Sequence, residues 1–235
     1  MPPITPFKVL LFSKTSGYRH ASIPAAITAL HFLAQKSKLF ETHATEDAEA
    51  AFTPSSLGQY AAIVLLHCTG DFLNPDQVEA LKNFVRAGGG VVGIHGAAAA
   101  MLENEWYGKL VGAHFDSHPA PEHGRVVVEG QNRGHYLLDG CGERDGWMDE
   151  WYNFRDHPRA NGGLNVLLKG DAASFSGGKM GDDHPLSWYQ EFEGGRAFYT
   201  ALGHFDEAYE DEWYMGQIFR AILWVAKAEE KRDLR

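Results

Sequence analysis

Two kinds of apolar pattern alternate along the first half of the chain. Apolar runs at 8–12, 61–67 and 91–94, and a shorter segment at 40–43, are typical of buried strands. Between them, apolar residues recur every three or four positions, as on one face of a helix. The first such helix is predicted to start at Ser22 and the second at Asn74, each followed closely by a proline. This alternation predicts an α/β fold of three layers, a doubly wound and mostly parallel sheet with helices on both faces.

The second half of the chain has a less regular pattern. It predicts a short helix at 106–111, strands at 125–129 and 164–168, and a hairpin of strands 187–192 and 196–201. A final helix has an apolar face of Met215, Ile218, Phe219, Ile222 and Val225. Because no repeat or linker interrupts the chain, we expect one domain over 1–235, with an ordered core at 8–226 and a short charged C-terminal tail.

Composition narrows the classes of partner. The 235 residues are 44% hydrophobic and 22% charged, as in an ordinary globular domain. The net charge of −10, with no basic block, argues against a nucleic-acid partner. No apolar run has the length of a membrane span, and the N-terminus lacks signal-peptide features. With only two cysteines, Cys68 and Cys141, we expect a cytoplasmic protein without a disulfide framework.

His95 occupies the most distinctive position in the sequence. It follows the buried strand at 91–94 and is flanked by Gly93, Gly96 and the alanines at 97–100, which permit a sharp bend. Such a strand-to-helix bend projects its apex side chain from the edge of the sheet. A helix starting there would aim its positive end at the imidazole and favour the neutral form. A neutral imidazole is a metal ligand, a general base or a hydrogen-bond acceptor, and the sequence does not choose among them.

Other polar side chains follow the predicted parallel strands. The loop after the first strand carries Thr15, Arg19 and His20, the loop after 61–67 carries Asp71, and His204 follows the second hairpin strand. Because ligands bind at the carboxyl ends of the strands in open α/β sheets, we expect these side chains to approach His95. The alternative is that they are ordinary surface residues of polar loops.

A further segment offers candidate metal ligands. His114 and His118 are four residues apart and would share a face of a helix, but Gly112 and Pro119 make a helix doubtful, and a polar loop is the alternative. The metal-ligand candidates are therefore His95, His114, His118 and His204.

A carboxylate also stands beside aromatic residues. In the segment at 149–152, Glu150 precedes Trp151 and Tyr152, a combination that suits a sugar but also a core aromatic cluster. His184, beside Asp182 and Asp183, lies in a turn signal and is a secondary site candidate.

These segments, taken in order, resemble the trehalose-utilisation (ThuA-like) family over nearly the whole chain. The matching stretches are 14–20, 69–71, 88–97, 106–107, 110–115, 117–119, 149–154, 184–188, 195–200 and 203–204. The resemblance implies a flavodoxin-like fold of the class I glutamine amidotransferase type. Amidotransferases have a cysteine at the apex that His95 occupies here, so glutamine hydrolysis through a thiolate is not expected. Members of the family also often have an acidic residue a few positions after the histidine that corresponds to His95, where this chain has alanines. Glu150 and Asp71 are therefore the candidate carboxylates of the site.

The resemblance implies a role in the metabolism of trehalose or a related disaccharide, including oxidised (keto) sugars. We expect general acid–base chemistry by His95, His204, Glu150, His20 and Asp71. The residues expected to bind the sugar are Arg19, Thr15, Tyr152, Trp151 and His184. The alternatives that stay open are a non-catalytic sugar-binding protein and a sugar hydrolase or isomerase that uses a divalent metal as cofactor. A homodimer is compatible with the aromatic-rich second half.

Overall fold

The protein is described by a computed structural model that covers residues 5–230, so the first four residues and the last five of the charged tail lie outside the described part. Within it, a nine-stranded sheet has the order β2-β1-β3-β4-β11-β10-β9-β6-β7. Its strands are β1 (Phe7–Phe12), β2 (Phe40–Thr45), β3 (Ala62–Leu66), β4 (Gly90–Ile94), β6 (Glu122–Val128), β7 (Arg144–Asp149), β9 (Asn165–Gly170), β10 (His184–Phe192) and β11 (Gly195–Thr200). A small separate sheet pairs β5 (Phe115–Ser117) with β8 (Asn153–Phe154).

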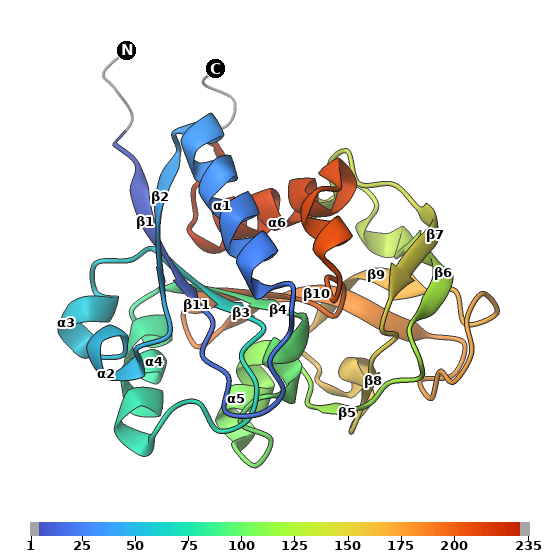
Figure 1. Ribbon diagram of the computed structural model, residues 1–235, viewed down its shortest axis with the longest axis horizontal. Helices are drawn as coiled ribbons and strands as arrows, with labels where there is room; N and C mark the ends of the chain where they lie inside the picture. Colours follow the sequence, from blue (N-terminus) through green and yellow to red (C-terminus); the bar gives the residue numbers. More distant parts are fainter. Residues whose placement is uncertain (1–4, 231–235) are drawn as a thin grey trace.

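Helices cover both faces of the large sheet, which confirms the three-layer prediction. Helices α1 (Ile23–Ser37) and α6 (Glu212–Val225) lie on one face, and α4 (Pro75–Arg86) and α5 (Glu105–Val111) lie on the other (Figure 1). Two single-turn helices, α2 (Ala48–Ala51) and α3 (Pro54–Leu57), precede β3. Among the described residues, no helix combines the length and the hydrophobicity that crossing a bilayer requires.

The prediction of a mostly parallel sheet is correct, although three strands were not predicted. Strands β2, β1, β3, β4 and β11 are mutually parallel, in the order typical of flavodoxin-like folds. Strands β10 and β6 run the other way, so seven of the nine strands of the large sheet share one direction. The polar strand β7 and the short strands β5 and β8 were not predicted, because they lack a long apolar run.

Close packing at the sheet centre fixes the edge where the site lies. All residues of β3 and β4 are buried, as their continuous apolar runs predicted. A Cβ on Gly90 would lie 2.4 Å from the carbonyl oxygen of Val225, so α6 packs directly on the backbone of β4. The carboxyl ends of β1, β3, β4 and β11 therefore form one rigid edge, from which four loops extend.

Two local details at this edge differ from what the sequence predicted. Ser22 occupies the N-cap position of α1, but its hydroxyl does not cap the helix and lies 3.4 Å from Nε2 of His67. The segment after β4 is a five-residue 3-10 helix (His95–Ala99), and the next α-helix begins only at Glu105. The expected helix N-terminus aimed at His95 is therefore absent from the described structure.

Candidate functional site

His95 stands at the apex of the predicted bend. It follows β4 directly and has a φ of 45°, in the left-handed region that L-residues rarely adopt. Its ring is fully buried, and Nδ1–H donates to the carbonyl oxygen of Ala201 at 2.6 Å. The ring of Tyr152 covers one side, with 4.2 Å between the ring centroids. In a neutral His95 ring this arrangement leaves the lone pair on Nε2, which faces the other polar side chains of the site.

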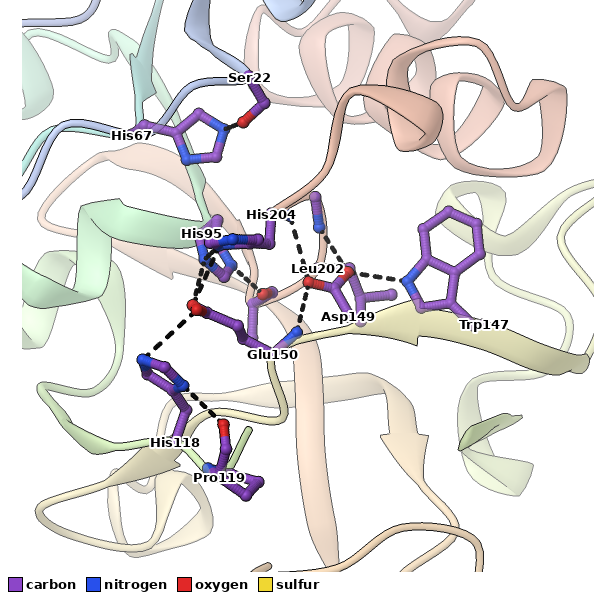
Figure 2. A network of polar contacts seen from close by, with 12 residues as sticks. Ser22, His67, His95, His118, Pro119, Trp147, Asp149, Glu150, Leu202 and His204 are labelled. Atoms are coloured by element: carbon purple, nitrogen blue, oxygen red, sulfur yellow. Dashed lines mark hydrogen bonds and ion pairs between the residues drawn. The ribbon is translucent and has the colours of Figure 1, made fainter. Parts of the chain in front are cut away.

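Glu150 connects three histidines. Its Oε2 lies 3.1 Å from Nδ1 of His204 and 3.3 Å from Nε2 of His95, while Oε1 lies 3.5 Å from Nε2 of His118 (Figure 2). Burial alone would raise the pKa of the Glu150 carboxyl, but His204 and His95, whose ring nitrogens lie against the carboxylate, lower this pKa far below its usual value. Glu150 is therefore an anion at neutral pH and holds the imidazoles around it.

His20 completes the group from the loop after β1. The centroid of its ring lies 4.8 Å from that of His95 and 5.3 Å from that of His204. Burial, with the nearby His95 and His204, lowers the pKa of His20 to about 3, so the ring is neutral at physiological pH. We call His20, His95, Glu150 and His204 the histidine cluster; one ligand atom from each lies within 4.8 Å of the others.

Asp149, which was not among the predicted site residues, fixes the loop that carries His204. This fully buried carboxylate accepts hydrogen bonds from the backbone N–H groups of Gly203 at 2.8 Å, His204 at 3.2 Å and Glu150 at 2.9 Å, and from Trp147 Nε1 at 2.8 Å. Burial raises the pKa of Asp149, and the nearby His95 and these hydrogen bonds oppose that rise. Asp149 thus joins the end of β7 to the segment after β11 (Figure 2).

His67 is a second residue near the cluster, after Asp149, that was not predicted from the sequence. It follows β3 as His95 follows β4, also with a positive φ, 53°, and it is fully buried. Its ring centroid lies 4.6 Å from that of His20, and its Nε2 lies 2.7 Å from the Tyr209 hydroxyl. Burial lowers the pKa of His67 well below its usual value. The signal that could have revealed it was its position at the end of an apolar run, the same signal that identified His95.

The expected sugar-binding residues divide into two groups. Arg19 is half-exposed near the first loop, where its guanidinium pairs with Glu46 at 2.7 Å and lies 3.4 Å from the Thr15 hydroxyl. Tyr152 lies against His95, as described above. Asp71 is exposed and is not part of the histidine cluster.

Trp151, His184 and His114 lie outside the cluster. Trp151 is fully buried and stacked on Phe175 at 4.3 Å between centroids, which matches the alternative core interpretation. Buried His184 donates from Nε2 to the backbone carbonyl of Tyr152 at 3.0 Å, so it supports the site from behind. His114 packs against α5, where a Cβ on Gly108 would lie 2.0 Å from its Nε2.

The histidine cluster is partly exposed to solvent. The side chains of His118, His204 and Glu150 are 35%, 15% and 10% exposed, whereas His95 is sealed beneath them. Tyr18, 67% exposed, stands edge-on to His20 at 4.9 Å and offers an aromatic ring at the rim that the sequence did not indicate. Glu150 and His204 therefore present surface that a ligand can contact, whereas His95 presents none.

The two cysteines are unsuited to thiolate chemistry. Cys68 is fully buried, its thiol donates to the carbonyl oxygen of Phe12 at 3.2 Å, and burial raises its pKa well above the usual range. Burial raises the pKa of Cys141 to about 11. Neither thiol belongs to the cluster, so the site has imidazoles and one carboxylate as its reactive groups.

The family model described as "ThuA: Trehalose utilisation" matches residues 8–225. The chain belongs to the ThuA family. That match spans β1 to the end of α6 and includes every residue of the histidine cluster. No curated protein matches the chain.

Solved structures support the ThuA-type fold. A protein described as ThuA-like from Bacteroides uniformis has a TM-score of 0.77 at 23% identity, covering 94% of this chain and 92% of that one. Another from Parabacteroides merdae has a TM-score of 0.73 at 18% identity, covering 94% and 90%. The cytoplasmic protein STM1381 from Salmonella typhimurium has a TM-score of 0.64 at 12% identity, covering 93% and 99%. At these identities the likeness establishes the fold.

Proposed function

We propose that this ThuA-family protein is a cytoplasmic enzyme that transforms trehalose or a related disaccharide, including a keto derivative, by proton transfer at the histidine cluster. The observation that carries the proposal is the convergence of three imidazoles and one carboxylate from four distant segments on the carboxyl edge of the sheet. Titratable side chains that converge from several separate loops are an indication of an active site. The family's description, trehalose utilisation, is the reason for proposing a disaccharide as the substrate.

We propose a different task for each of the four groups. His204 is partly exposed, and the carboxylate of Glu150 lies against its Nδ1. As the acceptor for Nδ1–H, Glu150 would orient the ring in the way that a carboxylate orients the histidine base of a catalytic triad. It would take a proton from a sugar hydroxyl or from a carbon beside a carbonyl, and return it to the product. Buried His95 and neutral His20 would hold Glu150 and His204 in place beneath the substrate. Tyr18 at the rim offers a face on which a sugar ring can stack.

A non-catalytic sugar-binding protein is the second candidate. It is favoured by the elbow, where Ala97, Ala98 and Ala100 are buried and add no polar group beside His95. Such a protein would bind a disaccharide saturably and release it unchanged.

The test is turnover by His204→Gln. Purified protein is incubated with trehalose, related disaccharides and their keto derivatives, and products are followed by mass spectrometry. Loss of a base typically costs about 10²–10⁴-fold in rate, so we expect that loss in His204→Gln with an unchanged melting temperature. The control, His114→Gln, alters a histidine outside the cluster and should retain activity. Binding without product in the wild type would favour the second candidate, and full activity in His204→Gln would contradict the proposal.

A further inference from the structure

One contact in the histidine cluster joins two acceptors. The Nδ1–H of His95 is used by the carbonyl of Ala201 at 2.6 Å, so Nε2 of a neutral ring carries only a lone pair. That lone pair faces Oε2 of Glu150 at 3.3 Å, and a carboxylate oxygen is also an acceptor. A proton or a cation must therefore lie beside these two atoms. The choices are the Nδ1–H of His204, which lies 3.3 Å from Nε2 of His95 and 3.1 Å from Oε2 of Glu150, a second proton on His95, or a cation.

The distances in the cluster match a cation. Nε2 of His95, Nδ1 of His204 and Oε2 of Glu150 form a triangle with edges of 3.3, 3.1 and 3.3 Å. In a tetrahedral site with metal–ligand bonds of about 2.0–2.1 Å, neighbouring ligand atoms are about 3.3–3.4 Å apart. The triangle is thus already the size of one face of a zinc tetrahedron.

His20 supplies the fourth group. One ring nitrogen of His20 lies within the 4.8 Å set. Its Nδ1 is buried and has no hydrogen-bond partner among the described residues. A buried ring nitrogen without a partner is costly in a finished hydrogen-bond network, whereas a small inward shift of this ring would complete a four-ligand site.

We propose that His20, His95, His204 and Glu150 bind one divalent transition-metal ion, with zinc as the expected occupant because three ligands are imidazoles. The surroundings fit this role. The Ala201 carbonyl fixes the His95 tautomer, and His118 lies at the second oxygen of Glu150, as the outer partners of metal ligands commonly do. His114, a metal candidate on sequence grounds, takes no part.

This inference rests on the same residues as the proposed function, but the two fail separately. With a metal bound, the four groups would act as its ligands, and a sugar oxygen or a water could be polarised only by joining them as a fifth ligand. Turnover by metal-free protein would leave the proton-transfer function standing without the metal, and metal binding without turnover would leave the site standing without the enzyme.

The experiment measures binding of Zn²⁺ and Co²⁺ to untagged protein that has been stripped with a chelator. We expect about one equivalent of Zn²⁺ per chain by mass spectrometry, and a visible Co²⁺ spectrum typical of four-coordinate sites. Glu150→Gln and His204→Gln should each weaken binding at least about tenfold. If one of these two variants does not fold, His20→Gln takes its place. The control His114→Gln should bind as the wild type does.

Two results would overturn the metal site. The first is the absence of saturable binding of either ion to folded wild-type protein, which would assign this place to a proton of His204 or His95 instead of a metal ion. The second is binding that survives all three cluster variants or is lost in His114→Gln.

Discussion

At the scale of single residues, Asp149 shows how a buried charge positions a neighbour without touching its side chain. Four N–H donors surround the carboxylate, and two of them belong to the backbone of Gly203 and His204. The imidazole of His204 then reaches Glu150 from a fixed origin. Pre-organisation of this kind is what separates a reactive group from a histidine that merely lies nearby.

We expect Asp149→Asn to destabilise the fold and to loosen His204. The amide keeps one acceptor oxygen and turns an NH₂ group toward N–H donors, so at least one buried donor loses its partner, at a cost of about 1–3 kcal/mol. Urea unfolding measures this loss. The exposed Asp145, in an ion pair with Arg125, provides the control Asp145→Asn, with an expected change within about 0.5 kcal/mol. Equal stability of the two variants would show that the hydrogen bonds of Asp149 do not stabilise this loop.

At the scale of elements, two neighbouring parallel strands end in the same way. Strands β3 and β4 are each followed by a buried histidine with positive φ, His67 and His95. The turn after β4 packs against the loops after β1 and β3 at Gly96. A Cβ there would lie 3.1 Å from Cε1 of His20, 3.1 Å from Cγ2 of Thr69 and 3.2 Å from Cα of His67. Three loops therefore share one tight contact beside the cluster.

Gly96→Ala should push His20 out of place. The added methyl group forces its neighbours apart by a few tenths of an ångström, with an expected loss of about 1 kcal/mol in unfolding free energy. The larger effect should be on ligand or metal affinity, which depends on the His20 position. Gly134→Ala is the matched control, because a Cβ at Gly134 meets nothing within 4 Å. Unchanged melting temperature and affinity in Gly96→Ala would show that the three loops yield freely.

The sequence was most informative where a rule of architecture could be applied. Apolar runs located the parallel strands, and the rule that their carboxyl ends share one edge predicted that His20, His95 and His204 meet. The convergence of Glu150 depended on β7, a polar strand without a periodic signal. Trp151 could not be distinguished from a sugar-stacking residue by composition, because burial is decided by packing on Phe175.

At the scale of the whole molecule, several buried histidines link stability to pH. The fold lowers the pKa of His184 to about 4 and that of His20 to about 3, from 6.5, and it also lowers the pKa of His67. Below pH 6.5 the unfolded chain takes up protons at these positions that the folded chain refuses. Glu150, whose pKa is lowered, stabilises the fold above its ordinary value of 4.5, and this contribution is lost as the pH falls below it. All four effects have the same sign.

We therefore expect the free energy of unfolding to fall steadily from pH 7 to pH 4 in the presence of a chelator. Each refused proton contributes a slope of up to about 1.4 kcal/mol per pH unit. Urea unfolding at intervals of half a pH unit measures the slope. His184→Gln retains a donor for the Tyr152 carbonyl and should flatten the curve between pH 6.5 and 4. Constant stability across this range would contradict the buried neutral histidines.

The most direct measurement of the central claim is a crystal structure of the protein with Zn²⁺ and a disaccharide of the trehalose type. We expect zinc among His20, His95, Glu150 and His204, and a sugar oxygen beside His204, with the sugar ring near Tyr18. A sugar found instead in the 960 Å³ apolar hollow between α1 and α6, with the histidine cluster untouched, would contradict it.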